Sequence, residues 1–240
     1  MGNLSLVKSL SHLREEQKYT DEIVLERWGI AFLRGGLAEI AGEPSSGKTS
    51  LPMTLLSQLT QTGEICAVVD SANSFDPCSA VLSGIELDNL LWVKCGGNLE
   101  KAFMSADMLV QAKGFGSVWL NLNGLPQREL RMVPRTYWYR YRNRIKETPT
   151  IFIVTAAEPL VGSASQRSLA FTRERSVWSG SGKYKLLREF HIRCQSTKGS
   201  GVIRHSDPRP FGSEKKVFQF PQRVFGDALP VKIEFDYAEI

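Results

Sequence analysis

Short apolar runs alternate with stretches of helical spacing along the first two thirds of the chain. The runs have the length of buried strands, and they predict strands at 36–41, 65–69, 90–93, 118–122 and 150–155. The stretches between them repeat apolar residues every three or four positions and predict helices at 48–60, 76–83, 99–112 and 136–146. This alternation indicates an α/β fold, in which helices cover both faces of a mostly parallel central sheet.

The pattern changes near residue 161, where loops rich in Ser, Gly and Arg begin. Strand-like pieces within this region predict an antiparallel C-terminal extension of the sheet, at 189–194, 217–220 and 231–235. The beginning of the chain is expected to form helices that pack on the core or on a neighbouring subunit. The predicted domains are a helical N-terminal segment at 1–34, a core at 35–198, and a strand-rich C-terminal extension or tail at 199–240.

A glycine-rich segment, GEPSSGKTS at 42–50, joins the first strand of the core to the first helix. Its spacing fits the P-loop pattern GxxxxGK[ST], in which glycines free the backbone so that several N–H groups face one polyphosphate. The lysine supplies positive charge to the terminal phosphates, and the hydroxyl after it ligates a magnesium ion. The predicted nucleotide site comprises Gly42, Glu43, Pro44, Ser45, Ser46, Gly47, Lys48, Thr49 and Ser50, with Thr49 as the Mg²⁺ ligand.

The alternative interpretation of this segment is a glycine-rich turn that opens an ordinary helix. Pro52 favours it, because proline is tolerated in a first turn but kinks a helix anywhere deeper.

Composition narrows the function classes only slightly. Apolar residues make up 42% and charged residues 23% of the 240 positions, which is ordinary for a folded domain. The scattered cysteines and histidines have no zinc-site spacing, and they give little support for histidine catalysis. No apolar run is long enough to span a bilayer and the N-terminus lacks a signal-peptide pattern, so a cytoplasmic location is expected.

Further motifs carry a resemblance to a known family. Beyond the P-loop, the stretch VVDSANSFDPCSAVLSGIELDNLLWVKC resembles the RecA recombinase family. Together with RTYWYRYRN and TPTIFIVTAAEP, it is most similar to the ImuA branch of bacterial RecA-like proteins, over roughly residues 35–198. The resemblance implies a RecA-like P-loop core that binds ATP and Mg²⁺. It also implies a role in the SOS-type DNA-damage response and translesion synthesis, with an ImuB-like Y-family-type protein and an error-prone DNA polymerase as partners.

The sequence departs from the pattern of that family at three sites. Ala72 stands where RecA-type enzymes carry the glutamate that activates the attacking water, and Asn121 stands where the Walker B aspartate ends a buried strand. Ala156 and Ala157 follow Thr155 where a polar side chain would sense the γ-phosphate. Because the loop, its lysine and its threonine remain, ATP binding is expected to survive better than hydrolysis.

The favoured function is therefore an ATP-binding accessory or scaffold protein that hydrolyses ATP poorly or not at all. A related hypothesis is that the RecA-like body docks on RecA itself and limits filament growth. The competing hypothesis is a DNA-stimulated ATPase or recombinase, with Asp70 as the best-placed substitute carboxylate and Glu43 or Asp76 as others. A P-loop kinase is disfavoured, because no substrate lid or acidic metal partner is found.

Two segments are rich in basic residues, and the net charge of +5 makes their placement important. In 128–146, helical spacing puts Trp138, Tyr141 and Ile145 on the core face and Arg140 and Arg144 outward, as a solvated face or as a phosphate or partner contact. The second segment, 163–190, occupies the place of the mobile DNA-binding loop of RecA-like folds. It would contact single-stranded DNA weakly or form a surface connection, and its candidate residues are Arg167, Arg173, Arg175, Lys183 and Lys185.

Overall fold

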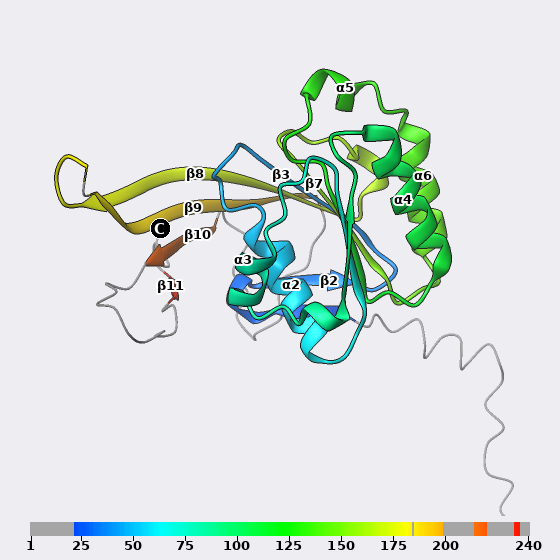
Figure 1. The fold of residues 1–240 in the computed structure, drawn as a ribbon, viewed down its shortest axis with the longest axis horizontal. Coiled ribbons are helices and arrows are strands. Elements are labelled where there is room, and N and C mark those ends of the chain that lie inside the picture. The colour runs from blue at the N-terminus through cyan, green and yellow to red at the C-terminus, as the bar shows by residue number, and fades with distance from the viewer. Residues whose placement is uncertain (1–21, 184, 199–213, 220–232, 236–240) are drawn as a thin grey trace, which may run out of the picture.

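One large sheet organises the molecule, with helices on both of its faces (Figure 1). The computed structural model describes residues 22–183, 185–198, 214–219 and 233–235. Nine strands form this sheet. In spatial order they are β11 (Ile233–Phe235), β10 (Glu214–Gln219), β9 (Leu186–Lys198), β8 (Arg167–Ser179), β3 (Leu37–Gly42), β7 (Ile151–Ala156), β6 (Ser117–Asn121), β4 (Cys66–Asp70) and β5 (Leu90–Lys94).

The strands from β8 to β5 run parallel, and β9 to β11 continue the sheet in antiparallel pairing. The predicted mostly parallel α/β fold and its antiparallel extension are confirmed. In the parallel part, Asp70 is paired with Asn121, and Asn121 with Thr155. Because parallel strands end at the same edge, this register brings three polar side chains into one row beside the loop that follows β3.

Helices pack on opposite faces of the sheet. The α-helices are α2 (Ser50–Gln61), α3 (Pro77–Leu82), α4 (Leu99–Ala112), α5 (Gln127–Arg131) and α6 (Arg135–Ile145), and the 3₁₀ helices are η1 (Glu26–Trp28), η2 (Leu87–Asn89) and η3 (Gly162–Ala164). Figure 1 shows α2 and α3 on one side and α4 and α6 on the other. The predicted helices are confirmed, and α5 is an additional one. None of the helices in the described ranges has the length and apolarity that crossing a membrane requires.

Each face of the sheet has its own apolar core. Leu55 and Leu59 of α2 pack with Trp119 and Phe171 on the first face. On the second face, α6 buries Trp138, Tyr141 and Ile145, which confirms their predicted inward orientation. The ring of Tyr141 stacks on Phe152 at 4.9 Å, and its hydroxyl donates to the Phe103 carbonyl oxygen at 2.9 Å. These aromatic residues stabilise the core and are not available to stack on bases.

The described start of the chain is a hairpin, formed by β1 (Glu22–Leu25) and β2 (Ile30–Leu33). The expected helix is therefore wrong for this part of 1–34, and residues 1–21 lie outside the described part. The sequences EIVL and IAFL each supply one short strand, and Gly29 turns the chain with a left-handed φ of 58°. Trp28 then anchors the hairpin, because its indole N–H donates to the Thr54 hydroxyl of α2 at 3.1 Å.

A long two-stranded arm replaces the loop expected at 163–190. Strands β8 and β9 pair along most of their length and reach well beyond the helical layers (Figure 1). The resemblance to RecA-like folds predicts a mobile loop here, and the many Arg and Ser residues obscure the alternation of a strand that is largely exposed. Strands β10 and β11 confirm the pieces expected at 217–220 and 231–235, while the rest of 199–240 lies outside the described residues.

A buried carboxylate in β3 fixes the turn that leads into β8. Glu39 accepts hydrogen bonds from the backbone N–H groups of Leu160 and Val161 and from the Ser168 hydroxyl. We expect Glu39→Ala to lower the free energy of unfolding by about 3 kcal/mol or more, because buried amides lose a charged acceptor. Urea denaturation measures this, with the exposed Glu147→Ala as the control. Equal midpoints for the two variants would contradict the assigned role.

Candidate nucleotide-binding site

The loop between β3 and α2 has the geometry of a phosphate cradle. Ser45 and Gly47 adopt left-handed φ values of 59° and 83°, which curl the backbone just ahead of the helix. The curl is held by two hydrogen bonds, from Ser46 N to the Glu43 oxygen at 3.2 Å and from Ser50 N to the Gly47 oxygen at 3.0 Å. Helix α2 begins at Ser50, so Pro52 lies in its first turn, where proline is tolerated.

Both glycines of the loop are required by close neighbours. A Cβ at Gly42 would lie 2.6 Å from the Phe171 carbonyl oxygen of β8. A Cβ at Gly47 would lie 3.0 Å from Cδ1 of Ile192 in β9, at a φ that also disfavours a side chain. The cradle is therefore packed directly against the base of the β8–β9 arm.

Lys48 lies inside the cradle and is only 6% exposed. Its ammonium group donates to the Glu43 carbonyl oxygen at 3.1 Å, and burial lowers the pKa of Lys48 below its ordinary value. The Ser46 hydroxyl is also buried, and it has no hydrogen-bond partner among the described residues. A cation and an unused hydroxyl at a helix N-terminus suit the terminal phosphates of a nucleotide, and Thr49 at the start of α2 is placed to ligate their Mg²⁺.

Asp70 at the end of β4 is committed to the neighbouring loop. One carboxylate oxygen accepts from Ser74 N at 3.0 Å, and the other accepts from Phe75 N at 2.8 Å. The carboxylate is fully buried and fixes the loop 71–75. These bonds disfavour Asp70 as the substitute base considered from the sequence, because activating a water would compete with them.

Asn121 at the end of β6 is held in a neutral hydrogen-bond network. Its side-chain amide donates to the Ser74 hydroxyl at 2.9 Å, and its amide oxygen accepts from the Thr155 hydroxyl at 3.1 Å. Asn123 adds a further donor at 2.7 Å, and the Trp119 indole donates to Thr155 at 2.9 Å. The position thus has structural partners but no negative charge to offer a metal ion.

Ala72 lies in the loop after β4, close to the loop that follows β6. Its Cβ would be 3.0 Å from a Cβ placed on Gly124. Of the other substitute carboxylates, Asp76 caps α3 by accepting from Cys78 N and Ser79 N, and hydrogen bonds from Ser79 lower the pKa of Asp76. Glu43 is exposed on the cradle. No group of three or more Cys, His, Asp or Glu residues with metal-site geometry occurs in the described ranges.

Arg140 and Arg144 do not form an open basic face. Both pair with one carboxylate, that of Asp107 on α4, and the Nε of Arg140 lies 3.3 Å from it. The guanidinium of Arg140 also stacks over the Tyr137 ring at 4.5 Å. These arginines therefore join α6 to α4. The sequence had suggested only a solvated face or a contact with phosphate or a partner.

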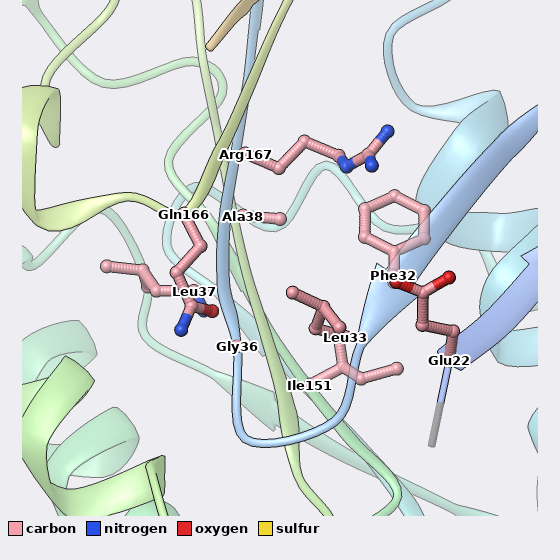
Figure 2. Close-up of a pocket in the computed structure, with 9 residues that line it drawn as sticks. All are labelled: Glu22, Phe32, Leu33, Gly36, Leu37, Ala38, Ile151, Gln166 and Arg167. Atoms are coloured by element: carbon pink, nitrogen blue, oxygen red, sulfur yellow. The ribbon is translucent and has the colours of Figure 1, made fainter. Parts of the chain in front are cut away.

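The other basic candidates lie along the arm, but they do not share one environment. Figure 2 shows Arg167, at the base of β8, pointing toward Phe32 and Glu22 of the N-terminal hairpin, beside a cavity of about 50 Å³. The remaining candidates are exposed: Arg173 and Arg175 on β8, and Lys183 and Lys185 in and after the turn. The arm thus separates one packed arginine from four accessible basic side chains.

Sequence reasoning missed Trp178, which is 56% exposed near the end of β8. An exposed indole among basic residues is a suitable platform for stacking on a base. The signal was present in the sequence as SVWSGSGK, where a tryptophan directly precedes a flexible turn. Only the structure shows that this tryptophan lies on a projecting strand, where its ring is exposed.

Comparison with known proteins agrees with this geometry. Residues 22–121 match the RecA N-terminal domain. Protein RecA of Methylococcus capsulatus is 41% identical over 114 residues, which cover 48% of this chain and 32% of that protein. Protein RecA of Acinetobacter baumannii is 40% identical over 85 residues, covering 35% of this chain and 24% of that protein. The chain therefore spans a third or less of the length of these relatives.

A solved structure, described as the RadB recombinase, has the same fold. It superimposes with a TM-score of 0.55 and covers 78% of this chain and 88% of the other, at 15% identity. At that identity the likeness concerns the fold alone. Residues 22–121 are thus similar in sequence to the RecA N-terminal domain, and the chain shares its fold with a recombinase structure.

Proposed function

We propose that this protein is a RecA-like accessory protein that binds ATP and hydrolyses it weakly or not at all. The observation that carries the proposal is a contrast within one site. The cradle around Lys48 is formed, whereas position 72 in the loop after β4 is alanine and position 121 at the end of β6 is asparagine, so neither supplies the carboxylate that hydrolysis would use. ATP turnover measured beside ATP binding tests the proposal, which requires binding with negligible turnover.

The energetics favour ATP binding without ATP hydrolysis. Backbone N–H groups, a helix N-terminus and one lysine supply most of what holds a polyphosphate, and all of these are present. A positioned general base commonly contributes about 10²- to 10⁴-fold in rate, and its loss leaves these binding contacts untouched. Asp70 does not replace it readily, since both of its oxygens already accept backbone hydrogen bonds.

ATP and Mg²⁺ would be held by different parts of the cradle. Backbone N–H groups of the loop, Pro44 excepted, and the Lys48 ammonium would contact the phosphates, and the Thr49 hydroxyl would ligate the metal ion. Bound magnesium polarises the phosphate oxygens, whereas Asn121 would support it only as a neutral neighbour. Mg²⁺ is therefore expected to add less to ATP affinity here than in a site with a Walker B carboxylate.

We place the protein in the SOS-type DNA-damage response and translesion synthesis, as a scaffold for other proteins. The support is the RecA-like domain together with the ImuA-type motifs in 35–198. The proposed partners are an ImuB-like Y-family-type protein and an error-prone DNA polymerase. RecA is a further proposed partner, because a RecA-like subunit with poor ATP chemistry would terminate a growing filament.

The arm is the part proposed to contact single-stranded DNA. Four exposed basic residues and Trp178 lie along it, in a geometry that suits phosphates and bases respectively. We expect simultaneous alanine replacement of Arg173, Arg175, Lys183 and Lys185 to reduce the slope of log affinity against log salt by about 2 to 3. Trp178→Ala should weaken binding by about 10-fold without changing that slope.

Fluorescence anisotropy with a labelled oligothymidine across a salt series distinguishes the two effects. Arg140→Ala is the matched control, because it removes a basic residue that is paired with Asp107 away from the arm. DNA affinity that is the same in the wild-type protein and in all these variants would contradict the proposed contact.

A further inference from the structure

We propose that a groove between α4, α5 and α6 docks a segment of a partner protein in which a large apolar side chain is flanked by Lys or Arg. This site is separate from the nucleotide cradle, because α4 and α6 lie on the face of the sheet opposite α2 (Figure 1). It also stands independently of the proposed ATP binding. None of the contacts that define it involves the P-loop.

The groove is large enough for several side chains. Its volume is about 480 Å³, and its lining includes the buried Phe103 and the half-buried Val133 and Tyr137, here called its floor. Leu99 and Met104 of α4 line one wall, and α5 with the turn after it lines the other. A hollow of this size matches the pockets that take small ligands or the anchor residues of a peptide.

Two methionines at the groove are exposed to an unusual degree. Met104 is 58% exposed on α4, and Met132 is 79% exposed just after α5. Methionine side chains are flexible and polarizable, so they adapt to an apolar partner, and exposed apolar side chains that gather at a groove mark an interaction site. Because both residues line the same hollow, an apolar segment bound there would contact both of them.

The rim of the groove determines the charge of the occupant. Glu100 and Glu129 line it, both exposed, and neither takes part in an ion pair among the described residues. Asp107 is already neutralised by Arg140 and Arg144. The rim is thus locally acidic on a chain whose net charge is +5. This charge attracts a basic segment and repels nucleic acid.

The groove is preformed and rigid at its base. The ring of Phe103 packs edge-on against Tyr137, with centroids 5.4 Å apart, and against Trp138 at 5.3 Å. Arg140 lies over Tyr137 and is held by Asp107. A rigid floor with flexible methionines at the rim lowers the ordering cost of binding while still accepting several anchor side chains.

The test is selection of a phage-displayed library of random dodecapeptides on the immobilised full-length chain. We expect enriched peptides to carry Phe, Trp, Leu or Met beside Lys or Arg. Binding of a synthesised winner is then measured by isothermal titration. The double variant Met104→Glu with Met132→Glu should weaken it by at least about 10-fold, and Glu100→Lys with Glu129→Lys by about 5-fold or more.

Met108→Glu is the matched control, because Met108 is 69% exposed on the same helix but does not line the groove. It should change affinity by less than about 2-fold. Selected peptides that lack basic residues, or that bind equally to wild-type and Met104/Met132 variants, would overturn the proposal. Self-association of the chain that is lost in the Met104/Met132 variant would also overturn it, since a second copy would then be the occupant.

Discussion

Replacing Lys48 with alanine is expected to weaken ATP binding by about 10- to 100-fold, because the variant loses a charge-assisted hydrogen bond in a site shielded from water. Lys48 is buried in the cradle, and its ammonium now donates to the Glu43 carbonyl oxygen. In the complex, negatively charged phosphate oxygens would accept from this ammonium in place of the neutral carbonyl oxygen, which strengthens the interaction. Titration with a fluorescent ATP analogue measures the change directly.

The control for this variant is Lys101→Ala, which removes the same charge from an exposed position on α4. It should leave ATP affinity unchanged within about 2-fold, since an exposed charge on the face of the sheet opposite α2 is screened by salt. Equal affinity in the wild-type protein and in Lys48→Ala would contradict the assignment of the cradle. A circular dichroism melt of each variant confirms that the comparison concerns folded protein.

The second large effect is an increase in the rate of ATP hydrolysis. We expect Ala72→Glu combined with Asn121→Asp to raise ATP turnover by about 10²-fold, because the pair supplies a general base and a carboxylate for magnesium. Ala72 lies beside the open loop that carries Gly124, and Asn121 ends the strand next to Asp70. Turnover is measured by phosphate release at saturating ATP and Mg²⁺.

Ala72→Gln with Asn121→Asp is the matched control, since it keeps the added volume but supplies no base. Both double variants should be less stable than the wild-type protein by about 1–3 kcal/mol, because aspartate cannot donate to the Ser74 hydroxyl as Asn121 does. If the glutamate variant folds and binds ATP yet turns over no faster than the glutamine variant, Ala72 is not the position of the missing base.

The sheet and its helices could be predicted because the parallel core gives a strong local signal. Strands buried on both faces, such as β4 with the sequence CAVVD, are continuous apolar runs. The P-loop was equally accessible, since its function depends on glycine, lysine and threonine at fixed spacing between a strand and a helix. Positions 72 and 121 are identified through the family resemblance, and the structure adds the hydrogen-bond partners of Asn121 and the closeness of Ala72 to Gly124.

The arm and the N-terminal hairpin could not be predicted for a different reason. Strand β8 is stabilised by pairing with β9 rather than by an apolar pattern of its own, because polar residues such as Arg173 and Arg175 fill its exposed part. The hairpin depends on Trp28 packing with Thr54 and Phe171, contacts that no local window contains. Tertiary pairing decided both elements.

The roles of single polar residues were also beyond the sequence. Asp70 had been considered as a base, but the loop conformation turns Ser74 N and Phe75 N toward both of its oxygens. Arg140 and Arg144 lie off the buried face of α6 as predicted, but their pairing with Asp107 of another helix is not visible in the sequence. In each case the partner comes from a different element or from a folded loop, so only the assembled structure reveals it.

We propose above all that this chain binds ATP without appreciable turnover. The most direct test measures ATP binding and phosphate release on one wild-type preparation, with and without single-stranded DNA. Saturable binding, with turnover near the background rate in both conditions, is the predicted result. Turnover that rises with single-stranded DNA and disappears in Lys48→Ala would contradict the account, and it would require a catalytic carboxylate other than the two that Ala72 and Asn121 replace.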